Sequence, residues 1–172
     1  MAPNETLTLA DIAQGKFRAG DFAVLGDPIA HSLSPVMHQA SLALLAPQHV
    51  GLRGRRYHRI LIHPDELESA LSHLRLLGAG GLNLTVPHKI EGLRLCQEKD
   101  ATAVDCGAAN TLVPVARGWR ALNTDGVGFA EALAEKSGAG PAGRPMVLLG
   151  AGGAARAVAT ACLRLGAASL LI

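Results

Sequence analysis

Short apolar runs, each bounded by turn residues, alternate along the chain with segments whose apolar residues recur at helical spacing. The runs predict strands over residues 21–26, 57–62, 81–85, 110–115, 119–122, 146–149 and 168–172. The segments of helical spacing predict helices over residues 36–45, 64–77, 87–97, 124–136 and 153–165, the first of them capped by Ser34. Strands that alternate with helices in this way are typical of an α/β fold with a mainly parallel sheet.

A stretch rich in glycine and proline, SGAGPAGRP over residues 137–145, interrupts this pattern and predicts a domain boundary. We expect residues 1–140 to form one α/β domain and residues 141–172 to form the first β-α-β unit of a Rossmann-type domain. Two parallel strands on their own leave faces that further strands and helices normally cover. The chain is therefore expected to be a fragment of a longer protein, with its second domain truncated.

The composition indicates a folded globular chain, since 49% of the residues are hydrophobic and 17% are charged. A formal net charge of +2 with scattered basic residues argues against a nucleic-acid surface, and the one dense basic cluster, residues 53–56, is interpreted as a solvated loop. The first residues do not form a secretory signal, and Arg156 interrupts the longest apolar run. We therefore expect a soluble protein that binds neither nucleic acid nor membrane.

The cysteines are odd in number and widely spaced, at positions 96, 106 and 162, which argues against a disulfide framework and against a zinc site. Histidines 31, 38 and 88 lie near polar motifs, but their spacing fits no metal site. The sequence predicts a protein of the reducing cytoplasm without a metal ion.

Gly150-x-Gly152-x-x-Ala155 lies directly between a predicted strand and a predicted helix. Small residues at this spacing allow a tight turn, a close approach of pyrophosphate to the backbone and close packing of the helix on the strand. The predicted cofactor-binding residues are Gly150, Ala151, Gly152, Gly153, Ala154 and Ala155. The residue that would choose between NAD and NADP falls at or beyond Ile172, so the motif leaves that choice open.

Polar residues gather where predicted strands end, in residues 26–35, in residues 83–89 and in the pair of segments 109–111 and 123–125. Polar groups beyond the strand ends of an α/β protein commonly form a small-molecule site. Their hydroxyls, amides, single ammonium and single carboxylate favour a polyhydroxylated substrate, with or without a carboxylate, over an apolar or phosphate-rich one.

These segments, in this order and ahead of a glycine-rich Rossmann start, resemble the shikimate dehydrogenase family over residues 22–172. The resemblance implies a substrate-binding domain, an NADP-binding domain and the interconversion of 3-dehydroshikimate and shikimate. It implies that Ser32 and Ser34 bind the substrate carboxylate, that Asn83, Thr85, Asn110 and Asp125 bind its hydroxyls, and that Lys89 and Asp125 form the catalytic pair. It leaves a homodimer open.

The residue types suit this chemistry on their own. Hydride delivery to a ketone produces an alkoxide, and an ammonium held beside a carboxylate can stabilise and protonate that oxygen. Each residue also has a purely structural interpretation: Lys89 as a solvated helix lysine, Asp125 as an acidic residue in a first helical turn and Ser34 as a helix cap.

Three alternatives stay open. The chain could belong to a quinate/shikimate or an aminoshikimate dehydrogenase, to a sensor that binds shikimate or quinate without catalysis, or to an inactive remnant. The presence of both Lys89 and Asp125 argues against a sensor, because a binding protein needs no proton donor. We expect the chain on its own to show little or no dehydrogenase activity.

Overall fold

The computed structural model describes residues 5–138 and 140–172. The strands of its main sheet are β1 (Thr6–Thr8), β2 (Phe22–Gly26), β3 (Tyr57–Leu61), β4 (Gly81–Leu84), β5 (Glu98–Lys99), β6 (Thr111–Pro114) and β7 (Trp119–Leu122). The α-helices are α1 (Leu9–Ala13), α2 (Ser34–Leu45), α3 (Leu67–Leu76), α4 (Lys89–Leu95), α5 (Ala101–Cys106), α6 (Asp125–Ser137) and α7 (Gly153–Arg164). Single 3-10 turns occur at η1 (Val50–Leu52) and η2 (Pro64–Glu66), and a second sheet pairs β8 (Pro145–Val147) with β9 (Ser169–Leu171).

The main sheet has the strand order β1-β3-β2-β4-β6-β7-β5. Strands β1 to β4 run parallel, and β5 is parallel to β7. Strand β6 is antiparallel to both of its neighbours, β4 and β7, and forms a hairpin with β7 through a tight turn at Gly118, where φ is +89°. The prediction of an α/β fold with a mainly parallel sheet is confirmed.

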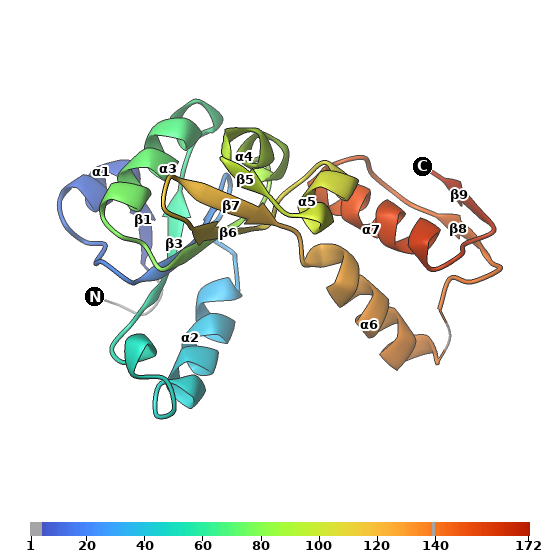
Figure 1. Cartoon of the computed structure of the whole chain (residues 1–172), viewed down its shortest axis with the longest axis horizontal. Helices are drawn as coiled ribbons and strands as arrows, with labels where there is room; N and C mark the ends of the chain where they lie inside the picture. Colours follow the sequence, from blue (N-terminus) through green and yellow to red (C-terminus); the bar gives the residue numbers. More distant parts are fainter. Residues whose placement is uncertain (1–4, 139) are drawn as a thin grey trace.

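Alternation along the strands divides the side chains between two faces of the sheet. Ala23 and Leu25 of β2 enter the larger core beneath α1 and α3, whereas Val24 enters a smaller cluster beneath α2. Figure 1 shows α1, α3 and α4 on one side of the sheet and α2 on the other. The α2 face also carries the polar side chains of Tyr57 and Asn83, because Tyr57 belongs to this smaller cluster and Asn83 pairs with Val24 across β2 and β4.

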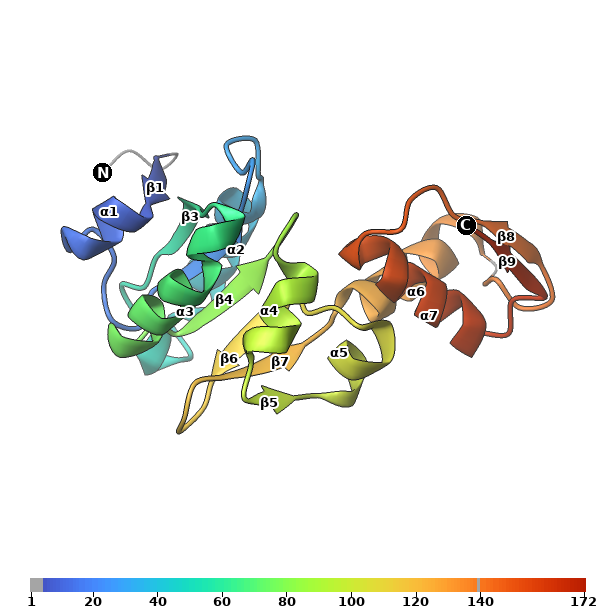
Figure 2. The ribbon, with the colours of Figure 1, turned by 90° about the horizontal axis from the view of Figure 1, so that it is seen from above.

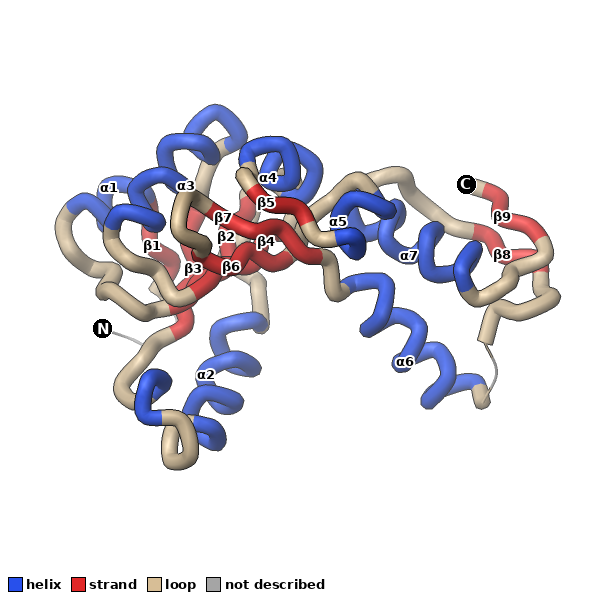
Figure 3. Tube along the Cα trace, viewed as in Figure 1, coloured by secondary structure: helices blue, strands red, loops and turns tan. Residues whose placement is uncertain are grey.

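Helix α6 leads from the end of β7 towards the second sheet, and α7 packs alongside α6 and against α5 (Figure 2). Ala157 and Cys162 of α7 are buried, and Ala157 packs against Cys106 and Ala108. Strands β8 and β9, which precede and follow α7 in the chain, pair in parallel with each other. They lie at the opposite end of the molecule from β1 (Figure 3). The strand-turn-helix-strand order predicted for residues 146–172 is present.

Two local predictions are wrong. Ser34 does not cap α2: Leu33 occupies the cap position, Ser34 is the first helical residue, and its N–H donates to the hydroxyl of Ser32 at 3.3 Å. The helix predicted over residues 87–97 spans only Lys89–Leu95, because Cys96 is extended and the next strand, β5, pairs with β7.

Candidate active site

Lys89 lies just beyond the C-terminal end of strand β4, at one end of the sheet. Leu82 and Leu84 point into the large core, and the chain then turns so that the N–H of His88 donates to the carbonyl of Thr85 at 2.8 Å. The buried His88 ring lies with Nε2 2.8 Å from the Ile62 carbonyl, to which it donates because a carbonyl only accepts. Burial lowers the pKa of His88 below its usual range. The neutral ring thus fixes the residue that directly precedes α4.

Lys89 and Asp125 form an ion pair beyond the C-terminal ends of strands β4 and β7. Each residue is the first of its helix, α4 and α6, and Lys89 Nζ lies 2.6 Å from Asp125 Oδ2. Both side chains are partly buried, with 13% and 25% of their surface exposed. The predicted catalytic residues are therefore in direct contact, and the pair still reaches solvent.

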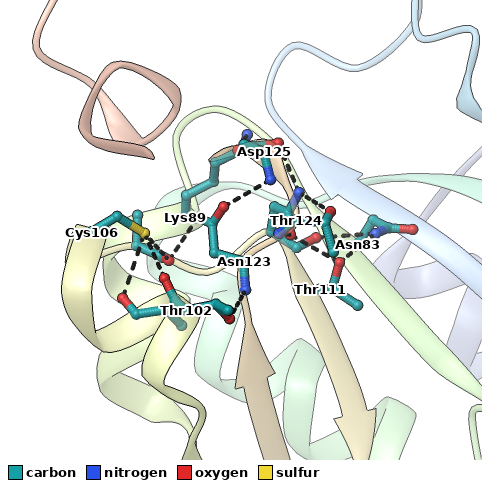
Figure 4. A network of polar contacts seen from close by, with 11 residues as sticks. Asn83, Lys89, Thr102, Cys106, Thr111, Asn123, Thr124 and Asp125 are labelled. Atoms are coloured by element: carbon teal, nitrogen blue, oxygen red, sulfur yellow. Dashed lines mark hydrogen bonds and ion pairs between the residues drawn. The ribbon is translucent and has the colours of Figure 1, made fainter. Parts of the chain in front are cut away.

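Asn110 holds the other oxygen of that carboxylate. Its Nδ2 donates to Asp125 Oδ1 at 2.7 Å and to Thr124 Oγ1 at 2.9 Å, two residues that are labelled in Figure 4. Its Oδ1 accepts from the Thr111 hydroxyl at 2.9 Å and from the Thr124 N–H at 3.0 Å. All hydrogen-bonding positions of the Asn110 amide are used inside the protein, so its orientation is fixed.

Asn83 continues this network under the α2 face. Its Oδ1 accepts from the Tyr57 hydroxyl at 2.6 Å, and its Nδ2 donates to Thr111 Oγ1 and to the Asn110 carbonyl, each at 3.1 Å. The Tyr57 ring stacks on His38 with centroids 4.3 Å apart, and burial raises the pKa of the Tyr57 hydroxyl. Hydrogen bonds therefore run without interruption from Tyr57 through Asn83, Thr111, Asn110 and Asp125 to Lys89.

Asn123 fixes the start of α6 through its side chain. Its side-chain amide donates to the Ala108 carbonyl at 2.9 Å, and its Oδ1 accepts the Asp125 N–H at 2.9 Å. Its backbone N–H donates to Thr102 Oγ1 at 3.0 Å. Asn123 is buried, so this residue is part of the scaffold of the pair.

The loop between β2 and α2 carries Ser32 and Ser34 at the same end of the sheet, beyond the C-terminal end of β2. The N–H of Asp27 donates to the Val86 carbonyl at 3.0 Å, and the N–H of Thr85 donates to the Leu25 carbonyl at 2.9 Å. Strands β2 and β4 are parallel neighbours, so the polar residues that follow both strands share one end of the sheet. Both serines are partly exposed, as is Thr85.

A cavity of about 490 Å³ lies beside the network, between α2 and strands β4 and β6. Tyr57, Asn83, Thr111 and Thr124 contribute polar groups to its wall, and Leu42 of α2 is among its apolar residues. Of the predicted site residues, Asn83 lines this cavity. The network therefore extends from the cavity, at Asn83, to the end of the sheet, where Lys89 and Asp125 lie.

Tyr57 supports the network and was not predicted from the sequence, whereas Thr111 and Thr124 fell within the predicted polar segments 109–111 and 123–125 without an assigned role. Strand alternation carried a usable signal, since Tyr57 and Asn83 lie on the same face of neighbouring parts of the sheet. The Asn110–Thr124 and Asn83–Thr111 hydrogen bonds join residues that are 14 and 28 positions apart, which no local pattern specifies.

The glycine-rich loop fits a dinucleotide phosphate. Gly150 has φ of +118°, and a Cβ added at Gly150 or Gly152 would meet no atom within 4 Å. Gly152 caps α7 without a side-chain hydrogen bond, so the first N–H groups of this helix have no side-chain cap and its positive dipole end faces the loop. Gly153 is different: a Cβ there would lie 2.7 Å from Lys89 Cβ. Residues 150–155 could therefore hold the phosphates of a dinucleotide, next to the predicted catalytic lysine.

Neither a metal centre nor a membrane span is found in the part of the chain that the structure describes. In residues 5–138 and 140–172, no three His, Cys, Asp or Glu side chains are placed to hold a metal ion. None of the helices in those ranges is long and apolar enough to cross a membrane.

Comparisons with known proteins show what the chain is similar to. The family described as "Shikimate dehydrogenase substrate binding domain" matches residues 24–112. A shikimate dehydrogenase (NADP(+)) of Moorella thermoacetica is 43% identical over 159 residues, covering 92% of this chain and 52% of the relative. One from Geobacter metallireducens is 40% identical over 158 residues, with the same shares covered. The chain thus spans about half the length of the curated relatives it matches.

Solved structures give the same picture. Shikimate dehydrogenase from Aquifex aeolicus superposes with a TM-score of 0.78 at 35% identity, over 88% of this chain and 55% of that one. The Thermus thermophilus enzyme in complex with NADP(H) and shikimate does so with a TM-score of 0.73 at 38% identity, over the same shares. With a family match that covers residues 24–112, the chain belongs to the shikimate dehydrogenase family.

Proposed function

We propose that this chain supplies the substrate-binding part and the acid–base pair of an enzyme that reversibly reduces 3-dehydroshikimate to shikimate with NADPH. The observation that carries the proposal is the 2.6 Å contact between Lys89 Nζ and Asp125 Oδ2 at an edge of the sheet lined by hydroxyls and amides. Similarity to enzymes named shikimate dehydrogenase (NADP(+)) supports the substrate and the cofactor.

In this proposal Ser32 and Ser34 donate hydroxyl hydrogen bonds to the substrate carboxylate, and Thr85, Asn83 and Asp125 bind its ring hydroxyls. Asn83 Oδ1 accepts one hydrogen bond in the structure and has a second lone pair for a substrate hydroxyl. Asn110 differs, because its amide is fully engaged inside the protein. Its main contribution is to orient Asp125, and direct contact with substrate requires exchange of one of these bonds.

The acid–base step uses the ion pair. NADPH bound at the Gly150–Ala155 turn would supply the hydride. The Lys89 ammonium donates a hydrogen bond, and then its proton, to the carbonyl oxygen as that oxygen becomes an alkoxide. Asp125 keeps the ammonium in place through Oδ2 while Asn110 holds Oδ1. In the reverse direction the neutral amine of Lys89 accepts the hydroxyl proton.

Two experiments test this function. Isothermal titration calorimetry of the chain with shikimate should show saturable binding, with quinate as the competing ligand. A chimera in which this chain replaces the matching part of the Moorella thermoacetica relative should oxidise NADPH in the presence of 3-dehydroshikimate. The chain alone should oxidise little. Absence of shikimate binding together with an inactive, folded chimera would refute the proposal, and tighter binding of quinate would favour a quinate/shikimate dehydrogenase.

A further inference from the structure

Arg59 is a charged residue in the middle of a strand that pairs on both sides. It lies in β3 opposite Thr6 of β1 and Val24 of β2. Its neighbours at two-residue spacing, Tyr57 and Leu61, belong to the apolar cluster beneath α2, so the Arg59 side chain leaves the sheet on the α2 face. A partly buried guanidinium at such a position needs polar partners.

Two of its partners belong to the loop that carries the two serines. Arg59 Nη1 donates to the Ala30 carbonyl at 2.5 Å and to the Ser32 carbonyl at 3.3 Å. The loop is folded on itself at the same place: Ser32 N–H donates to the Ile29 carbonyl at 3.0 Å, and Ser34 N–H donates to Ser32 Oγ at 3.3 Å. One guanidinium thus fixes two peptide groups next to the residues proposed to bind a carboxylate.

The charge of Arg59 bears on the same ligand. Serine hydroxyls are neutral, and a carboxylate that leaves water for such a site is favoured by a nearby cation. A carboxylate that accepts from the Ser32 hydroxyl comes within roughly 10 Å of the Arg59 guanidinium, given ordinary bond lengths and hydrogen-bond distances. At that separation, with the effective dielectric constant of ~20 typical near a protein surface, a unit charge changes affinity by about 15-fold before salt screening reduces the effect.

We propose that Arg59 is a positioning and specificity residue: it holds the Ser32–Ser34 loop in its binding shape and supplies the positive charge that selects a carboxylate over a neutral ligand. This inference rests on the proposed function only for the identity of the ligand. The role in holding the loop stands on the contacts alone.

Arg53 provides a matched control. It also donates from its guanidinium to two loop carbonyls, those of Ala46 at 3.3 Å and Pro47 at 3.2 Å. These carbonyls follow the C-terminal end of α2, whereas Ser34 begins the same helix. An α-helix rises ~1.5 Å per residue, so the two loops are separated by roughly 18 Å.

The loop role is tested without ligand. ¹⁵N relaxation should give Ser32 and Ser34 backbone order parameters near ~0.85 in the wild-type chain and below ~0.7 in Arg59→Gln, because a released loop moves on the nanosecond timescale. Arg53→Gln should leave both values unchanged. Order parameters for Ser32 and Ser34 that stay at the wild-type value in Arg59→Gln would overturn this part of the inference.

The selectivity role is tested by dissociation constants for shikimate and for its uncharged methyl ester. Wild type should prefer shikimate by at least about fivefold, Arg59→Gln should lose most of that preference, and Arg59→Lys and Arg53→Gln should retain it. If Arg59→Gln weakens the affinity for shikimate and for the methyl ester equally, so that the preference stays intact, the charge role is overturned. If wild type binds neither ligand, the proposed function fails, and the relaxation measurement still decides whether Arg59 holds the loop.

Discussion

The carboxylate of Asp125 accepts from Lys89 on one oxygen, at 2.6 Å, and from Asn110 on the other, at 2.7 Å. With a donor on each oxygen, the plane of the carboxylate is fixed, and so is the direction from which it holds the ammonium. Lys89 is the first residue of α4, where the helix dipole disfavours a cation, whereas Asp125 begins α6, where the dipole favours an anion. A lysine kept in an unfavourable local position is typical of a functional residue.

Replacement of Lys89 by methionine should lower kcat of the chimera by about 10²- to 10⁴-fold, the usual contribution of a general acid, and should change KM by less than about threefold. Steady-state NADPH oxidation measures both constants. Lys99→Met, at an exposed position of β5, is the control and should match the parent. An unchanged kcat in Lys89→Met would remove this residue from the mechanism.

Thr111 links the two amides of the network, because its hydroxyl accepts from Asn83 and donates to Asn110. Thr111→Val keeps the shape but leaves both amides short of a partner, and should lower the free energy of unfolding by about 1–3 kcal/mol. Thr111→Ser retains the hydroxyl and should lie closer to wild type. Urea denaturation compares the three proteins, and equal stability of the valine and serine variants would contradict the assigned network.

Asp21 and His58 form a buried pair at the other end of the sheet, with Asp21 Oδ2 3.0 Å from His58 Nε2 and Asp21 Oδ1 accepting the Arg56 N–H at 3.0 Å. Asp21→Ala removes both bonds and should cost about 3–5 kcal/mol in the free energy of unfolding. Asp65→Ala, at an exposed position, should change it by less than about 0.5 kcal/mol. A loss below about 1 kcal/mol for Asp21→Ala would show that the pair contributes little to stability.

Two histidines should titrate on opposite sides of the usual value of 6.5. Burial lowers the pKa of His88, whereas the hydrogen bond to Asp27 raises the pKa of His63. His88 therefore destabilises the fold as pH falls below about 6.5, because the unfolded chain takes up its proton first. His63 adds stability below about 6.5, which is lost as pH rises through its raised pKa.

NMR titration of the imidazole carbon-bound protons measures both midpoints directly. His63→Gln should also make the free energy of unfolding fall more steeply between pH 7 and pH 5, because a contribution present at low pH is removed. A His88 midpoint above that of His63 would contradict the environments assigned to the two rings.

The sequence was sufficient where the pattern was long and regular. Strands β2, β3 and β4 and helices α3, α6 and α7 lie within a few residues of the predicted ranges, because their apolar residues repeat at the period of the element. Strands β1 and β5 and helix α5 were missed: the strands have only three and two residues, and the six residues of α5 make fewer than two helical turns, so none of them shows a period. For α5 a capping signal was present, since Asp100 caps its start and Gly107 ends it with φ of +63°.

The same contrast applies to the site. Polar residues at predicted strand ends indicated a small-molecule site, and the resemblance to the shikimate dehydrogenase family gave Lys89, Asp125 and Ser32 their roles in it. The glycine-rich turn could be proposed from its spacing between a strand and a helix. The arginine that holds the serine loop could not, because Arg59 and Ser32 are 27 positions apart and their contact arises from the pairing of β2 with β3. The use of every hydrogen-bonding position of Asn110 likewise follows from the register of β4 and β6 and from the turn after β7.

The start of α7 limits where the Lys89 side chain can lie. The Lys89 stem rests against bare backbone at Gly153, where any side chain would collide with it. The loop proposed to hold the cofactor therefore also forms one wall of the space that the lysine occupies, so the two proposed ligand sites share this contact.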